Sequence, residues 1–158
     1  MRRRNRSILL GRLLAGLVDR VSHRGGETLR IMAEANVTLQ QVLLITRLRR
    51  EASCSASDLA AALNLSLPAI SQSIDRLLKA GLVSRIENPV DRRKKLLATT
   101  QKANDLLSRL EIARAAEYGT GLSALSAAAQ QELAAVLSAV LHQLKVKTNP
   151  DGEPSCST

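Results

Sequence analysis

Residues 55–81 read SASDLAAALNLSLPAISQSIDRLLKAG, and this stretch decides the fold. Ser55 and Asp58 have the spacing of a capping box, which predicts a short helix that begins at Ser55 and stops at Asn64. A second helix follows at once, with Ser66 as its N-cap, a proline in its first turn and a left-handed glycine, residue 81, at its end. The stretch therefore predicts two helices joined by a tight turn.

The second helix has one apolar side and one polar side. Its apolar side carries Ile70, Ile74, Leu77 and Leu78 at helical spacing. The opposite side carries small and polar residues, namely Pro68, Ala69, Gln72, Asp75, Arg76 and Lys79, with Ser71 and Ser73 at its edges. We expect the apolar side to pack on the core and the small, polar side to remain available for contact.

A basic hairpin follows the two helices. Residues 82–86 (LVSRI) and 96–98 (LLA) are apolar runs that predict strands, and residues 88–91 (NPVD) predict a turn. The basic run 92–95 (RRKK) lies next to that turn. The sequence therefore predicts two strands with a positively charged tip.

Helices are predicted on both sides of this region. An amphipathic helix over Leu9–Val21 is followed by an interruption at residues 23–26 and a weaker helical patch that ends near residue 36. Thr38 and Gln41 form another capping box, whose helix should bury its apolar members Val42, Leu43, Ile45 and Leu48. Thr100 caps a long helix that should end around residues 118–121, and Ser126 caps a last helix with the stripe Leu133, Val136, Leu137, Val140, Leu141 and Leu144. The tail from residue 149 lacks apolar periodicity and is predicted to be disordered.

Composition restricts the function. The chain has 158 residues and a formal net charge of +9, which suggests a polyanionic partner. Tyr118 is the single aromatic residue, so base stacking on aromatic platforms is largely excluded as a binding mode. No apolar run is long enough to cross a bilayer, and we expect no membrane association. The basic start followed by Ile8, Leu9 and Leu10 imitates a signal peptide, but Arg12 and Asp19 interrupt the apolar stretch at helical spacing, so a cytoplasmic protein is expected.

A helix-turn-helix with a basic hairpin is suited to double-stranded DNA. Its second helix can lie in the major groove while the hairpin reaches phosphates or the minor groove. Gln72 can pair with adenine, and Arg76 can reach a guanine or a phosphate. The same polar residues are also typical of a solvated helix face, but the adjacent basic hairpin favours nucleic-acid contact.

The residues from 58 to 100 resemble the MarR family of bacterial transcriptional regulators. The resemblance rests on Asp58–Ala60, Leu67–Leu77, Lys79–Arg85, Asn88–Arg93 and Thr99–Thr100, and the similar region runs from about Val37 to Ala103. It implies a homodimer with interleaved terminal helices, a pseudo-palindromic operator, and repression that is relieved by a small molecule or an oxidant. By position, it also implies base contacts by Ser71, Gln72, Ser73 and Arg76, entry of Arg93 into the minor groove, and support of Arg93 by Asp91.

Some residues depart from the family pattern. Gly25 and Gly26 interrupt the entry into the domain, and the aromatic residues that often line effector pockets are nearly absent. Cys54 does not lie in the amino-terminal region where peroxide-sensing members carry their cysteine; it is interpreted as a buried, inert thiol, with a redox sensor activated by nearby arginines as the alternative. Cys156 is interpreted as a spare thiol. Two histidines, His23 and His142, do not make a metal site, and no catalytic motif is present.

The sequence thus predicts an all-α protein with a small β-wing. The expected domains are an N-terminal dimerisation region (1–37), a winged helix-turn-helix DNA-binding domain (38–99), C-terminal dimerisation helices (100–146) and a disordered tail (147–158). No enzyme activity, cofactor or metal is expected, and a small-molecule effector, with no site assigned, is a further candidate partner. The alternative function is an architectural or protein-interaction module that binds DNA non-specifically. The predicted DNA-binding residues are Ser66, Pro68, Ala69, Ser71, Gln72, Ser73, Arg76, Lys79, Arg92, Arg93, Lys94 and Lys95, with Asp91 as support for the wing.

Overall fold

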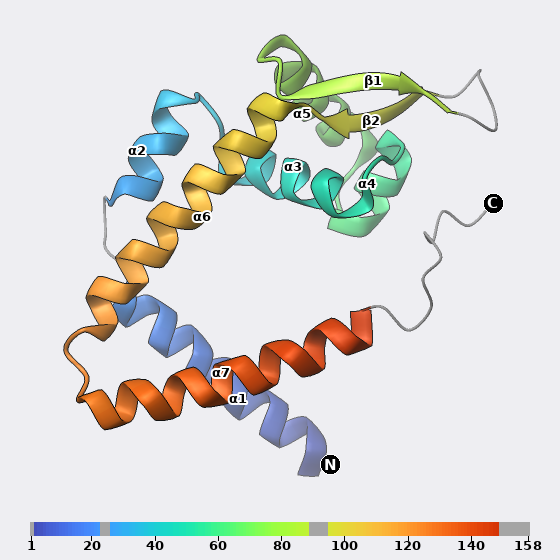
Figure 1. Cartoon of the computed structure of the whole chain (residues 1–158). Coiled ribbons are helices and arrows are strands. Elements are labelled where there is room, and N and C mark those ends of the chain that lie inside the picture. The colour runs from blue at the N-terminus through green and yellow to red at the C-terminus, as the bar shows by residue number, and fades with distance from the viewer. Residues whose placement is uncertain (1, 23–25, 89–94, 149–158) are drawn as a thin grey trace. The chain divides into compact units, whose positions relative to one another are not determined.

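The computed structural model describes residues 2–22, 26–88 and 95–148 (Figure 1). Within them one two-stranded antiparallel sheet accompanies helices, so the predicted fold class, all-α with a small β-wing, is confirmed. The elements in chain order are α1 (Arg2–Val21), α2 (Glu27–Glu34), α3 (Leu39–Glu51), α4 (Ala56–Leu63), α5 (Leu67–Lys79), β1 (Val83–Glu87), β2 (Lys95–Thr99), α6 (Gln101–Leu122) and α7 (Ala127–Thr148).

The chain divides into two compact units. Of the described residues, those within 28–112 form one unit, and those within 2–27 and 113–148 form the other. The first therefore contains α3, α4, α5, the sheet, nearly all of α2 and the first half of α6. The second contains α1, the rest of α6 and α7. The four domain limits expected from the sequence remain a prediction.

Capping residues determine where α3 and α4 begin. The Thr38 hydroxyl accepts from the amide of Gln41 at 3.3 Å, and the Gln41 side-chain oxygen accepts from the amide of Thr38 at 2.8 Å. Ser55 and Asp58 make the same reciprocal pair, at 3.2 and 2.9 Å. Each box satisfies two amide groups that a helix start leaves without partners. Both predicted boxes are confirmed.

Helix α5 begins after Ser66, the predicted N-cap residue, but the Ser66 side chain makes no capping hydrogen bond. An N-cap side chain normally accepts from the amide of the second or third helical residue. The second residue here is Pro68, which has no amide hydrogen, so one of the two usual donors is missing. At the other end Gly81 has φ +69°, as predicted, and the amide of Leu82 donates to the carbonyl of Leu77 at 2.9 Å.

The core of the larger unit is aliphatic and lies among α3, α4, α5 and the first half of α6. Leu43 was expected in it but is 51% exposed, whereas its neighbour Leu44 is fully buried. Because a helix turns 100° per residue, Leu44 falls in one stripe with Gln41, Ile45 and Leu48, and Leu43 falls outside that stripe. The largest fully buried side chains are Leu44, Ile45, Leu48, Leu59, Ile70, Leu77 and Leu110.

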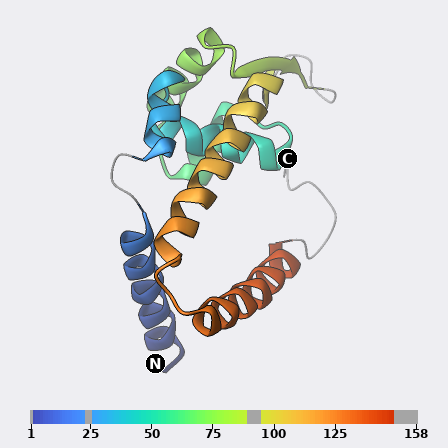
Figure 2. The ribbon, with the colours of Figure 1, turned by 60° about the vertical axis from the view of Figure 1, so that its left-hand side comes forward.

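The sheet lies against these helices. Strands β1 and β2 pair in the register Val83 with Thr99 through Glu87 with Lys95. The backbone of Cys54, just before α4, joins the same sheet: its amide donates to the carbonyl of Leu97 at 3.2 Å, and its carbonyl accepts from the amide of Leu97 at 2.9 Å. Figures 1 and 2 show α5 and the two strands at the same side of this unit. The start of the helix-turn-helix is therefore bonded directly to the wing.

The smaller unit contains a close contact between α1 and α6. Helix α1 begins at Arg2 rather than at Leu9, and α6 continues through Gly119 and Gly121 to Leu122. A methyl group at Gly121 would lie 2.6 Å from the α-carbon of Val21. Glycine at this position therefore permits the end of α1 to lie against α6.

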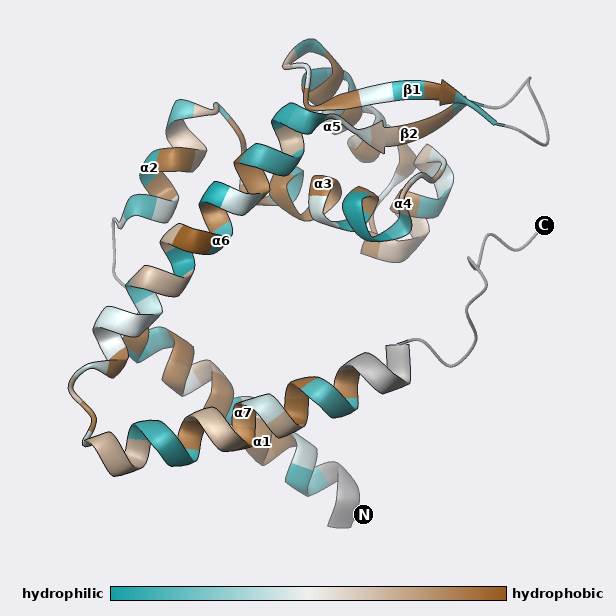
Figure 3. Ribbon diagram, in the orientation of Figure 1, coloured by the Kyte–Doolittle hydropathy of each residue, from teal (hydrophilic) through white to brown (hydrophobic). Residues whose placement is uncertain are grey.

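Large apolar side chains remain exposed on α1 and α7. On α1 they are Ile8, Leu9, Leu10, Leu13, Leu14 and Val18, and on α7 they are Val136, Leu137, Val140, Leu141 and Leu144. Figure 3 shows hydrophobic positions, in brown, along both helices. The predicted stripes thus exist, but within the described part of one chain these side chains stay largely uncovered. None of the helices described is long and apolar enough to cross a membrane.

Candidate nucleic-acid interface

Helix α5 presents the predicted contact residues on its outward side. Its inner side is fixed by Ile70, Ile74 and Leu77, which are all buried. Gln72 and Lys79 lie roughly opposite these three residues on the helix, as a turn of 100° per residue requires. The exposed members of the predicted set in and next to α5 are Ser66, Pro68, Gln72, Arg76 and Lys79, and the half-buried members are Ala69, Ser71 and Ser73.

The amino-terminal half of this outward side is uncharged and compact. Pro68 and Ala69 lie in its first turn, and Ser71 and Ser73 flank Gln72. Small side chains allow a helix to approach base edges closely in the major groove. The cations Arg76 and Lys79 lie in the carboxyl-terminal half, where the helix dipole is negative and stabilises them.

The wing is described only in part. Lys95 begins β2, is exposed, and pairs with Glu87 across the strands at 3.1 Å. The other predicted wing residues, Asp91, Arg92, Arg93 and Lys94, lie outside the described residues. Strands β1 and β2 hold the two ends of that segment through the register of Glu87 with Lys95.

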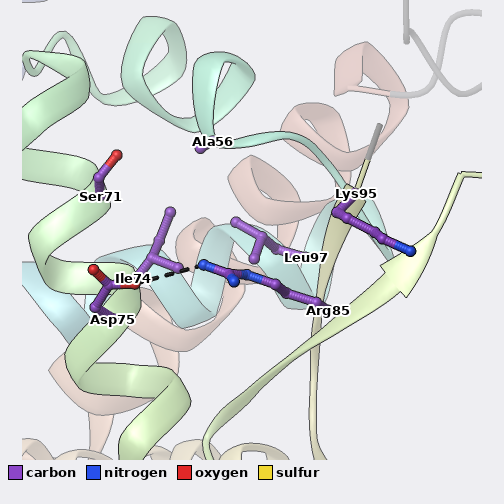
Figure 4. Close-up of a pocket in the computed structure, with 7 residues that line it drawn as sticks. All are labelled: Ala56, Ser71, Ile74, Asp75, Arg85, Lys95 and Leu97. Atoms are coloured by element: carbon purple, nitrogen blue, oxygen red, sulfur yellow. Dashed lines mark ion pairs between the residues drawn. The ribbon is translucent and has the colours of Figure 1, made fainter. Parts of the chain in front are cut away.

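Sequence reasoning missed one ion pair in this region. The guanidinium of Arg85 on β1 lies 3.6 Å from the carboxylate of Asp75 on α5. Figure 4 shows this pair beside a shallow hollow of about 120 Å³, whose other lining residues are Ala56, Ser71, Ile74, Lys95 and Leu97. The period of two along β1 puts Arg85 on the same face as buried Val83, and this signal was present in the sequence.

Cys54 is buried, as expected for an inert thiol. Only 4% of the residue is exposed, and its backbone is held in the sheet by Leu97. The arginines thought to activate it include Arg49, which pairs with Glu111 on α6. A peroxide-sensing thiolate needs solvent access and nearby positive charge. Among residues 2–22, 26–88 and 95–148, no cluster of three or more metal-ligating side chains occurs.

Comparisons with known proteins agree with this geometry. Residues 37–95 match the model of the MarR family. An uncharacterised HTH-type transcriptional regulator of Bacillus subtilis, YhbI, is 27% identical over 92 residues, which cover 58% of this chain. The chain spans only 59% of the length of that relative.

Solved structures share the fold. The transcriptional regulator Tm0710 of Thermotoga maritima has a TM-score of 0.73 at 17% identity, over 88% of this chain and 96% of its own. A mutant of MarR from E. coli, solved in complex with operator DNA, has a TM-score of 0.52 at 24% identity, over 87% and 96%.

The fold and the contact surface together define a winged helix-turn-helix protein. Its α4–turn–α5 unit is followed at once by the two-stranded wing, in the order that the sequence predicts. The matched region, residues 37–95, contains α4, α5 and β1 and ends at the first residue of β2. The match to the MarR family model over this domain confirms the resemblance seen in the sequence.

Proposed function

We propose that this protein is a dimeric, sequence-specific DNA-binding transcriptional regulator of the effector-responsive repressor type. The observation that carries the proposal is the outward side of α5, where Gln72, Arg76 and Lys79 are exposed, with strands β1 and β2 following directly in the chain. The family match supports a regulator rather than an enzyme. Such a protein acts on chromosomal DNA, so we place it in the bacterial cytoplasm, at the nucleoid.

DNA capture is electrostatic in this proposal. The net charge of +9 attracts the duplex, and each phosphate contact releases condensed counterions. For about eight phosphate contacts per dimer, log affinity should fall with log salt at a slope of roughly −7. Lys79, Lys95 and the wing cations at 92–94 are the proposed contributors.

Base selection follows capture. Gln72 is exposed at the middle of α5, and its amide can donate to and accept from adenine in the major groove. Arg76, one turn further along the helix, can reach a guanine or a phosphate. The wing arginine, Arg93, is proposed to enter the adjacent minor groove, where narrow A·T-rich segments attract arginine.

The dimer is supported by the apolar residues that one chain leaves exposed. On α1, Leu10 and Leu13 are 65% and 62% exposed, and α7 has a stripe of similar exposure. Contiguous exposed apolar surface of this kind marks an interaction site. Two-fold symmetry of such a dimer predicts half-sites about one helical turn apart on DNA, roughly 10 bp.

An effector has room to bind in the larger unit. A hollow of about 490 Å³ is lined by residues from the ends of α2 and α5 and from α6, including Glu34, Leu82, Lys102, Leu106 and Arg109. This volume falls in the range of small-molecule sites. A compound bound there relieves repression only if it prefers the conformation that does not bind DNA. A thermal-shift screen of small metabolites, followed by release assays on bound DNA, tests this part of the proposal.

The decisive experiment is selection of bound duplexes from a random pool at physiological salt. An Arg93→Ala variant is run in parallel, with Arg30→Ala as a control that removes the same charge from α2. We expect a palindrome with half-sites about one turn apart, weakened by Arg93→Ala and unaffected by Arg30→Ala. Absence of any enriched sequence would instead support the architectural or protein-interaction alternative.

A further inference from the structure

A carboxylate lies on the side of α5 that we propose faces DNA. Asp75 is exposed and lies on the helix between the base-reading Gln72 and the cation Lys79. DNA phosphates are negative, so a free carboxylate at this position opposes binding of any duplex. In a recognition helix, the negative charge of such a residue must be neutralised by a neighbouring cation or must itself contribute to the selection of DNA.

Arg85 provides the neutralising charge from a different element. Its guanidinium nitrogen lies 3.6 Å from the Asp75 carboxylate, and the pair joins α5 to β1 (Figure 4). The hollow beside the pair, lined also by Ser71 and Leu97, leaves open space next to the Arg85 side chain. The guanidinium can therefore move away from Asp75 without disturbing the core.

A contribution to folding stability does not explain the presence of this ion pair. Both side chains are more than half exposed, at 58% for Arg85 and 62% for Asp75. Ion pairs of this exposure contribute little to folding, because water screens the charges and ordering two side chains costs entropy. The attraction matters more when DNA covers the surface, because exclusion of water lowers the local dielectric constant.

We infer that Asp75 and Arg85 act as a selectivity pair for DNA, an inference that rests on the proposed function. Asp75 holds Arg85 away from the phosphates, so an arbitrary duplex gains one phosphate contact fewer. Arg85 in turn neutralises Asp75, so the reading side of α5 keeps a balanced charge. The pair therefore lowers non-specific affinity and widens the ratio between specific and non-specific binding.

Three variants test the inference: Asp75→Asn, Arg85→Gln and the double variant. The probes are a duplex of about three helical turns, roughly 30 bp, that carries the enriched sequence, and a scrambled duplex of the same composition. Arg30→Gln is the matched control, because Arg30 on α2 is 56% exposed and pairs with Glu34, close to the exposure of Arg85. Binding is measured across a salt series.

We expect Asp75→Asn to raise affinity for the scrambled duplex by about threefold to tenfold and to steepen its salt slope by about 0.9, the value for one added phosphate contact. The ratio of specific to non-specific binding should fall accordingly. Arg85→Gln should weaken binding of both duplexes by about tenfold, because it leaves Asp75 without its counter-charge. The double variant should recover to within about twofold of wild type, since coupled residues are not additive.

Two results would overturn the inference. A double variant as weak as Arg85→Gln would mean that Arg85 contacts DNA directly. An Asp75→Asn variant with unchanged affinity and salt slope on the scrambled duplex would mean that the Asp75 carboxylate does not hold Arg85 away from the phosphates. Failure of wild type to bind either duplex is a different outcome, because it would remove the proposed function itself.

Discussion

Gly121 on α6 lies so close to Val21 that any side chain there would meet the backbone of α1. A built methyl group comes within 2.6 Å of the Val21 α-carbon and 2.8 Å of its carbonyl oxygen. Val21 is itself buried, so it has no free direction in which to move. Gly119, two residues earlier on the same helix, has nothing within 4 Å of the same built atom. The two glycines therefore differ in packing although both are helical.

This difference predicts opposite effects of the same substitution. Gly121→Ala should lower the free energy of unfolding by about 1–3 kcal/mol, because overpacking forces the helices apart. Gly119→Ala should leave stability unchanged or raise it by roughly 0.5–1 kcal/mol, since alanine favours a helix interior. Urea unfolding at one fixed protein concentration measures both. Equal effects of the two substitutions would contradict the close contact.

The two serine caps should also behave differently. Ser55→Ala should destabilise the protein by about 1 kcal/mol, because it removes the acceptor for the Asp58 amide. Ser66→Ala should cost only a few tenths of that, because the Ser66 side chain makes no capping bond. Thermal unfolding of both variants under identical conditions checks the prediction. A large loss for Ser66→Ala would indicate a capping bond at α5 after all.

Replacement of Gln72 and of Lys79 should separate sequence reading from phosphate contact. Gln72→Ala should reduce discrimination between the enriched and scrambled duplexes by about tenfold, since one bidentate base contact is worth roughly 1–3 kcal/mol. Lys79→Ala should weaken both duplexes equally and make the salt slope shallower by about 1. Fluorescence anisotropy titrations across a salt series measure both quantities. Similar behaviour of the two variants on both duplexes would argue for non-specific binding.

The exposed leucines of α1 and α7 should control the oligomeric state. Leu13→Glu and Leu141→Glu should each shift sedimentation at micromolar concentration from dimer to monomer, because burial of an unpaired carboxylate in an apolar interface is costly. Leu39→Glu is the control, since Leu39 is equally exposed, at 61%, but begins α3 in the other unit. Both variants remaining dimeric would place the interface elsewhere on the chain.

Cys54 should be slow to react. In a Cys156→Ser background, the Cys54 thiol should react with an aromatic disulfide reagent about a hundredfold more slowly in native buffer than in urea, because reaction requires local opening. Peroxide should leave DNA affinity unchanged. Rapid stoichiometric modification of the native protein, with release of DNA, would instead establish the redox-sensor alternative.

Local signals in the sequence predicted most of the fold. The Thr38 and Ser55 boxes, the stop at Asn64 and the left-handed Gly81 are each determined by residues within one turn, and all are confirmed. The helical spacing of the apolar residues likewise predicted which side of α5 is buried and which is exposed. Ser66 is likewise the N-cap residue of α5, but its side chain makes no capping bond, and Pro68 at the second helical position lacks one of the two usual donors.

Contacts between distant segments were not predicted. The bonds between Cys54 and Leu97, which are 43 residues apart, depend on how the chain folds back onto the wing. The same is true of the pair of Asp75 and Arg85, since the helix period places Asp75 on a face of α5 and the strand period places Arg85 on a face of β1, but neither places one residue opposite the other. The assignment of individual DNA-contact residues remains a prediction, as does the role of the wing tip.

The residues that anchor α5 in the core are different from those on its outward side, so the DNA target can change independently of the fold. Ile70, Ile74 and Leu77 hold the helix in the core, while Gln72 and Arg76 contribute nothing to it. Substitutions at exposed positions usually change stability by less than about 0.5 kcal/mol. A duplicated gene can therefore acquire a new set of target promoters through a few outward substitutions, with no compensating change in the fold.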